Sequence, residues 1–165
     1  MMKGDYMYPA RLAIVLTMLF GIFSSAALAA EGDRPPVATY AKVYRGPEGL
    51  TVSVLGIGAP ENEEFLLQYS GINHDWNWKI FKAKRVPGGT GHDYMVIVDG
   101  SDYATLIERK SGWGGSLIQA YIPKTADGAP MTYDEGLSQQ IKPQHYLTDY
   151  LEQERGNPVR GAAWR

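Results

Sequence analysis

The sequence predicts a mainly β protein of the α+β class, in which about seven antiparallel strands form a meander and helix is confined to the C-terminal part. Short stretches of alternating apolar and polar residues recur from about residue 38 to residue 122, and turn-forming residues separate them. Helical spacing of apolar residues follows, between residues 134 and 155. The chain has no cysteine, so an apolar core must stabilise the fold without disulfides.

Residues 1–29 have the three regions of a secretory signal peptide. Lys3 and Arg11 supply positive charge, an apolar run follows Arg11, and Ala27 and Ala29 are the small residues of a cleavage site. The apolar run is shorter than the roughly 20 residues that a membrane-spanning helix needs. We therefore expect cleavage near Ala29 and no stable membrane insertion afterwards, with an uncleaved anchor as the alternative. Because small secreted eukaryotic domains usually depend on disulfides, the missing cysteines favour a bacterial periplasmic or secreted protein.

The charge balance gives no reason to expect nucleic acid as a partner. The formal net charge is −2 at pH 7, and removal of the signal peptide takes Lys+Arg from 16 to 14 and Asp+Glu from 18 to 17, which leaves about −3. A mildly acidic chain does not attract nucleic acid or an anionic membrane. The missing cysteines exclude thiol catalysis and thiolate metal sites, and the chain contains no cofactor motif, so no cofactor is predicted.

The mature chain is predicted to be one domain. Residues 30–37 are polar and contain proline, which predicts an extended leader, and residues 38–155 form the β-rich domain with its C-terminal helix. Residues 123–133 are predicted to link the sheet to the helical part. Residues 156–165 are predicted to be a flexible tail.

Seven strands are predicted, over residues 39–45, 50–56, 65–70, 78–86, 93–99, 103–109 and 116–122. Residues 46–49 (GPEG) predict a tight hairpin turn, residues 87–93 (PGGTGHD) a loop, and residues 110–115 a glycine-rich turn. The pattern suits an open sheet and a small barrel equally.

The C-terminal residues predict one or two helices that pack on the sheet. Asp134 is placed as the N-cap of a short helix over residues 134–141, and Pro143 suits a first helical position. A second helix over residues 145–155 carries one apolar stripe, made of Tyr146, Leu147, Tyr150 and Leu151.

Three segments repeat an arrangement of turn residue, polar residue, aspartate and aromatic residue. They are residues 72–76, 90–94 and 99–103, with aspartates at positions 75, 93 and 102. Turn chemistry explains much of this pattern, because Asp and Asn side chains close turns and aromatic residues favour strands. The alternative is that these loops form a binding surface.

Two His–Asp pairs, His74–Asp75 and His92–Asp93, suggest metal chemistry at first sight. In a hairpin of the predicted strands, however, the pairs lie near opposite ends, about 20 Å or more apart at 3.3 Å per residue. A single metal ion needs all its ligands within about 2.0–2.6 Å, so a shared site is not expected. His145 lies on the second predicted helix, where nothing connects it to either pair. No catalytic or metal-ligating residue is predicted.

Binding of a partner or ligand is the remaining class of function. Trp76 and Trp113 stand beside aspartate or glycine and are predicted to lie on the surface, whereas Trp78 is predicted to face the core. The candidate binding residues are Asn73, His74, Asp75, Trp76, His92, Asp93, Tyr94, Asp102 and Trp113.

The leading functional prediction is an exported, non-catalytic protein that binds a protein partner through loops 71–77 and 110–115, with Trp and Tyr as anchors. In outline the chain resembles small periplasmic inhibitors of cell-wall hydrolases and immunity proteins, a likeness of class that assigns no residue. The alternative is a glycan or cell-wall binding module that uses Trp76 and Trp113. The third hypothesis is a metal-dependent hydrolase that uses His74 or His92.

Overall fold

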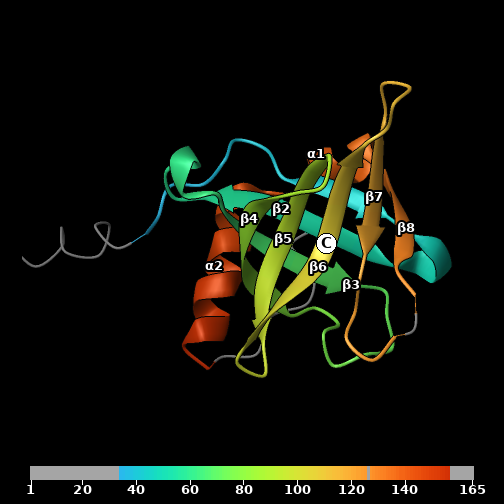
Figure 1. Cartoon of the computed structure of the whole chain (residues 1–165). Helices are drawn as coiled ribbons and strands as arrows, with labels where there is room; N and C mark the ends of the chain where they lie inside the picture. The colour runs from blue at the N-terminus through green and yellow to red at the C-terminus, as the bar shows by residue number, and fades with distance from the viewer. Residues whose placement is uncertain (1–33, 126, 157–165) are drawn as a thin grey trace, which may run out of the picture. The chain divides into compact units, whose positions relative to one another are not determined.

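The computed structural model describes residues 34–125 and 127–156. The predicted signal peptide and the predicted tail beyond residue 156 lie outside the described residues. Within the described part, eight antiparallel strands follow one another around a closed barrel, and two helices come after the last strand (Figure 1). The strands are β1 Lys42–Arg45, β2 Thr51–Ile57, β3 Glu64–Ser70, β4 Ile80–Gly88, β5 Gly91–Val98, β6 Ser101–Lys110, β7 Ser116–Ala120 and β8 Ala129–Tyr133. The helices are α1 Glu135–Gln140 and α2 Pro143–Glu154, with short 3-10 turns at Pro47–Gly49 and Pro60–Asn62.

The predicted fold class is confirmed, and the sheet closes into a barrel rather than staying open. The predicted linker 123–133 was wrong in part, because it contains β8. Gly128 and Pro130 are residues typical of turns, so the sequence pattern did not predict a strand here. Proline is tolerated because β8 is a short closing strand that pairs with β1 through Tyr133 and Thr132, beyond Pro130.

The predicted loop 87–93 was also wrong, because the two strands run through it. Pro87 pairs with His92 and Gly88 with Gly91, so the turn contains Gly89 and Thr90. Glycine is needed at position 91, where a Cβ atom would lie 2.0 Å from the carbonyl oxygen of Glu108. Glycine in this segment therefore allows β5 to approach β6 closely, in addition to forming the turn.

Two hydrophobic cores hold the fold together. The first lies inside the barrel and contains Val52, Leu67, Tyr69, Leu106 and their inward neighbours. Its main polar contact is the Tyr69 hydroxyl, which donates a 2.9 Å hydrogen bond to the carbonyl oxygen of Thr105. Burial raises the pKa of Tyr69, so this hydroxyl stays a neutral donor.

The second core lies outside the barrel wall, where α2 packs with Tyr146 and Leu147, as the apolar stripe predicted. The Tyr146 hydroxyl donates to the carbonyl oxygen of Ser53 at 3.2 Å. The side-chain amide of Gln153 accepts from the backbone N–H of Ile80 at 2.9 Å and donates to the carbonyl oxygen of Ile80 at 2.7 Å. Gln153 thus supplies β4 with hydrogen bonds like those of a neighbouring strand.

Helix α1 extends the seam between the last and first strands. Asp134 is its N-cap, as predicted, and accepts from the backbone N–H of Leu137 at 2.9 Å. The Ser138 hydroxyl accepts a 2.8 Å hydrogen bond from the N–H of Val43, while the Asp134 N–H donates to the Val43 carbonyl at 2.9 Å. These contacts provide hydrogen-bond partners for the backbone N–H and carbonyl of Val43, which do not pair with β8.

The meander gives the barrel two distinct ends. We call the end at which β2, β4, β6 and β8 finish the upper end, and it carries the β2–β3, β4–β5 and β6–β7 connections. The opposite lower end carries the β1–β2, β3–β4, β5–β6 and β7–β8 connections. In Figure 1 the β6–β7 hairpin projects at the top, whereas the β3–β4 loop lies at the bottom.

Candidate functional site

The β3–β4 loop, residues 71–79, folds back into the lower end of the barrel. Its Trp76 side chain is 7% exposed, so the prediction that Trp76 lies on the surface was wrong. The indole packs on Phe81, Tyr69 and Tyr103, with ring centroids 4.5, 5.4 and 6.0 Å away. Polar neighbours in the sequence suggested exposure, but the turn directs this one large ring inward. Trp76 therefore closes the lower end.

The other residues of this loop support the closure. His74 accepts a 3.1 Å hydrogen bond from the backbone N–H of Trp76 through Nδ1, and its ring contacts the indole edge-on. Asn73 and Asp75 are exposed beside it. Trp78 was predicted to face the core from a strand, but it precedes β4, has a φ of 66° and is partly exposed.

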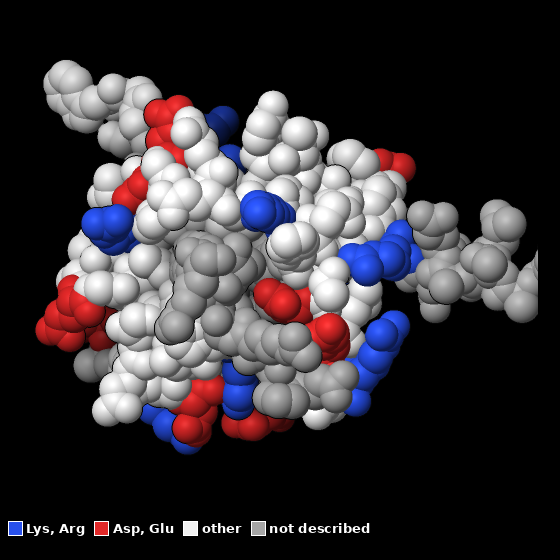
Figure 2. All heavy atoms as spheres, turned by 180° about the vertical axis from the view of Figure 1, so that it is seen from behind, with Lys and Arg blue, Asp and Glu red and all other residues white. Residues whose placement is uncertain are grey.

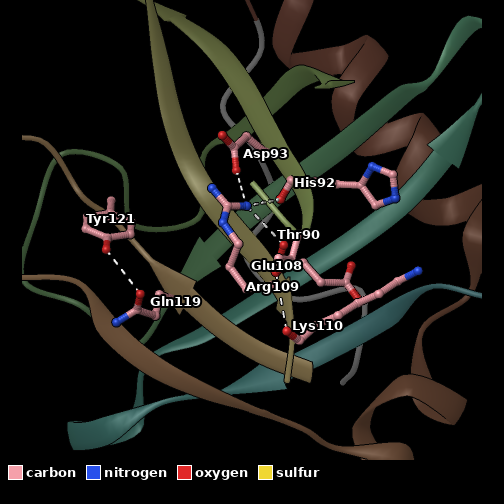
Figure 3. Close-up of polar contacts among 8 residues, drawn as sticks. All are labelled: Thr90, His92, Asp93, Glu108, Arg109, Lys110, Gln119 and Tyr121. Carbon is pink, nitrogen blue, oxygen red and sulfur yellow. Dashed lines mark hydrogen bonds and ion pairs between the residues drawn. The ribbon is translucent and has the colours of Figure 1, made fainter. Parts of the chain in front are cut away.

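The three candidate residues on β5 do not share one exposed surface. The imidazole of His92 and the carboxylate of Asp93 lie on opposite sides of the strand (Figure 3). Asp93 Oδ1 is buried and forms an ion pair with Arg109 Nη1 at 2.5 Å, without hydrogen-bond geometry to any described residue. Tyr94 is buried inside the barrel. These residues therefore do not form one surface patch.

The predicted binding loops are at opposite ends of the barrel. Residues 71–79 and the exposed Asp102 belong to the lower end, whereas the β6–β7 loop with Trp113 belongs to the upper end. The two loops, which the sequence analysis grouped together, therefore do not meet in one continuous patch. His74 and His92 are separated in the same way. In the described part of the chain no group of three or more His, Asp or Glu side chains is placed to hold a metal ion.

Trp113 is on the surface, as predicted, and is 99% exposed. It lies in a tight turn in which Ser111 N–H donates to the Gly115 carbonyl at 2.7 Å and Gly114 N–H to the Ser111 carbonyl at 3.1 Å. Apart from the adjacent residues, no described residue has an atom within 4 Å of a Cβ placed at Gly112, Gly114 or Gly115. The hairpin thus presents a large aromatic ring to solvent, clear of the barrel.

Exposed apolar side chains are distributed unequally between the two ends. Among the described residues, the exposed large hydrophobic side chains at the upper end are Tyr40, Trp113, Leu117 and Tyr133. Ile97, near the end of β5, is the corresponding side chain at the lower end. The upper end is therefore the better candidate for an interaction surface.

The upper end also carries ionisable residues inside the barrel wall, of which the sequence analysis named His92 and missed Arg85 and Glu108. Arg85 lies opposite the buried Tyr94, and Glu108 lies opposite His92 and the buried Ile118. Cross-strand partners share one face of a sheet, so Arg85, His92 and Glu108 face inward. Figure 3 shows the His92 ring and the Glu108 carboxylate on the same side of the sheet. The sequence contained a signal for Arg85. Phe81, Ala83 and Arg85 are at alternate positions of β4, so they share the inward face.

Electrostatic contacts organise this inward group. The Arg85 guanidinium forms an ion pair with Glu63 and lies 5.0 Å from the centre of the Phe65 ring. Its hydrogen bond to Glu63 lowers the pKa of that carboxyl. Burial raises the pKa of Tyr94, and the hydrogen bond with Arg85 opposes that rise. Burial, with Tyr94 and Glu108 nearby, raises the pKa of Tyr44.

Replacement of Glu63 by glutamine is expected to reduce the loss of stability in acid. Because the folded-state pKa of Glu63 is lowered, its contribution is present above the unfolded-state value and is lost as the pH falls through the folded-state value. The pair is partly exposed, so the difference should stay below about 1 kcal/mol. Urea unfolding between pH 7 and pH 3 measures it, with Glu61→Gln on the same loop as control. Identical pH profiles for wild type and Glu63→Gln would contradict the assignment.

Fold and site together define a closed eight-stranded up-and-down β-barrel, with a core of side chains inside, a lower end closed by Trp76 and an upper end rich in aromatic and charged groups. Comparison with models of protein families, with curated proteins and with solved structures finds no match. None of the described helices has the length and hydropathy of a membrane span. Basic and acidic side chains are interspersed on the face drawn in Figure 2, and neither sign gathers there.

Proposed function

We propose that the chain is an exported, non-catalytic binding protein that holds a protein partner at the upper end of the barrel, with Trp113 as the anchor. The observation that carries the proposal is the 99% exposure of this indole on a tight, projecting hairpin. Trp is enriched among the residues that dominate protein interfaces, and one indole buries about 150–250 Å². A well-defined turn also limits the entropy that binding must overcome.

The choice of the upper end follows from what surrounds each loop. The lower end is occupied by the buried Trp76, whereas Leu117 and Tyr133 add exposed apolar area to the upper end. A single exposed apolar residue is ordinary on a protein surface, but several at one end favour an interface. The glycan alternative that relied on both tryptophans is weakened, because Trp76 is not accessible.

The choice of binding over catalysis rests on the interior and on the ionisable groups. Packed side chains occupy the inside of the barrel. Arg85 is paired with Glu63, and Asp93 with Arg109, so these groups already have structural partners. Export is supported by the signal-peptide pattern of residues 1–29.

Trp113→Ala should weaken partner binding by roughly 30-fold, the loss expected for an interface residue worth about 2 kcal/mol. The measurement is a pull-down with the full chain, expressed in a bacterium with a C-terminal tag, from periplasmic and secreted extracts, followed by titration of the captured protein. Ile97→Ala is the matched control, since Ile97 is an exposed apolar residue near the other end. Equal capture by the Trp113 variant, or no protein captured by the wild type, would reject the proposal.

The mass of the same purified bait tests export. Cleavage near Ala29 predicts a chain that begins at about residue 30 and is recovered from the periplasm or medium. Recovery of the uncut chain from the cytoplasm would remove that part of the proposal.

A further inference from the structure

The pairing between β4 and β5 is incomplete at the lower end of the barrel. The two strands are paired only as far down as Lys84 and Met95. Residues 80–83 of β4 and residues 96–98 of β5 therefore have no partner across this junction. We call this break in the pairing the β4–β5 gap. Its strand edges present backbone donors and acceptors to which an extended segment can bind.

Helix α2 supplies hydrogen bonds to the first residue of one edge. Gln153 bonds both the N–H and the carbonyl oxygen of Ile80, so these groups point away from β3 and into the gap. Backbone groups alternate in direction along a strand, so the N–H and carbonyl of Lys82 also point into the gap. On β5 the register directs the backbone groups of Ile97 into the gap from the other side. The described residues provide no strand partner for either.

The β5 side of the gap is apolar and acidic. The Ile97 side chain is 65% exposed, and the exposed Asp102 is its cross-strand partner on the same outer face. Asp99, in the β5–β6 turn, is exposed as well. Neither aspartate forms an ion pair with a described residue, whereas Lys82 across the gap is paired with Glu64 at 2.7 Å. A segment that carries an apolar side chain and a positive charge therefore suits this surface.

The C-terminal segment, residues 157–165, begins close to this gap. Helix α2 ends at Glu154, one residue after Gln153, and Figure 1 shows that end at the level of the β5–β6 turn. Nine residues span up to about 30 Å when extended, which is more than the gap requires. The segment contains two large apolar side chains, Val159 and Trp164, together with two arginines and no acidic side chain. Its composition complements an apolar and acidic surface.

We propose that residues 157–165 dock across the β4–β5 gap, with Trp164 against Ile97 and an arginine beside Asp102. Contact between the indole and Ile97 removes apolar area from water, and the arginine neutralises an unpaired carboxylate. Docking within one chain is favoured over docking from a second copy, because a short connection gives a high effective concentration. The docked segment replaces the flexible tail predicted from the sequence. The site is independent of a protein partner at Trp113, which lies at the other end of the barrel.

The test compares, by NMR, the isotope-labelled full chain without a tag and the same chain ended at Gly156. Truncation should change the chemical shifts of residues 80–84 and 96–102 and should speed amide exchange there by about tenfold or more. Trp164→Ala in the full chain should reproduce most of these changes at unchanged chain length. Trp113→Ala is the matched control, because it is the same substitution at an exposed position of the other end and should leave the gap unchanged.

A synthetic peptide of residues 157–165 provides a second measurement. Added to the truncated chain, it should restore the full-chain shifts at the gap, and Asp102→Asn should weaken its binding by about threefold.

Three results would overturn the assignment. The first is identical shifts and exchange at the gap with and without the segment, which would show that it is free in solution. The second is a dependence of the gap shifts on protein concentration, which would assign the segment to a second copy. The third is peptide binding or truncation effects confined to residues elsewhere on the barrel. Melting temperatures show whether each variant is folded. Loss of partner capture in the Trp113 experiment would leave these results unaffected.

Discussion

Trp76→Ala should lower the free energy of unfolding by about 3–5 kcal/mol, the usual cost of removing a large aromatic side chain from a core. The indole is 7% exposed and packs on Phe81, Tyr69 and Tyr103. Its removal leaves a cavity at the lower end that the surrounding strands cannot easily fill, because they are paired around a closed barrel.

Urea denaturation at neutral pH measures this effect. Trp113→Ala is the matched control, since the same substitution at a 99% exposed position should change stability by no more than about 0.5 kcal/mol. The two variants also separate stability from recognition, because Trp113→Ala alone should reduce partner binding in a protein of normal stability. Equal losses of stability would show that residues 71–79 do not close the barrel as described.

Gly71→Ala should cost about 3 kcal/mol or more, for two separate reasons. Gly71 has a φ of 76°, a left-handed conformation that costs a residue with a Cβ atom about 1–2 kcal/mol. A Cβ atom at this position would also lie 2.1 Å from the carbonyl oxygen of Gly49, so one backbone segment must move. Overpacking of this kind typically adds about 1–3 kcal/mol.

Gly100→Ala separates the two contributions. Gly100 has nearly the same φ, 78°, but apart from its two chain neighbours no described residue has an atom within 4 Å of a Cβ placed there. Its replacement should therefore cost about 1–2 kcal/mol. The difference between the two variants in urea denaturation gives the cost of the contact with Gly49, and a difference of zero would show that the loop tolerates the shift.

Strand and helix patterns made much of this fold predictable. Val52 and Val54 alternate with polar residues and belong to β2, and the stripe that contains Tyr146 and Leu147 packs α2 on the barrel. Asp134 was identified as an N-cap because its chemistry depends on residues three positions away. The strand that contains Pro130 was not predicted. It is defined by its pairing with β7 and β1, and local composition gives no information about that pairing.

The candidate site was less predictable, because exposure depends on contacts between distant residues. Trp76 lies between Asp75 and Asn77, and Trp113 lies between two glycines, so turn-forming residues flank both, yet one closes the barrel and the other is exposed to solvent. Arg85 and Glu63 come together across the β3–β4 pairing, 22 positions apart.

Local pattern alone was therefore enough for the β class, the helical C-terminal part and the chemistry of the caps, because these depend on side-chain period and on neighbours within one turn or strand. Closure of the barrel and the assignment of loops to its two ends depend on strand pairing between residues far apart in the chain. Each pairing is selected by the burial of the whole inward face, so only the folded chain determines which aromatic rings remain in solvent.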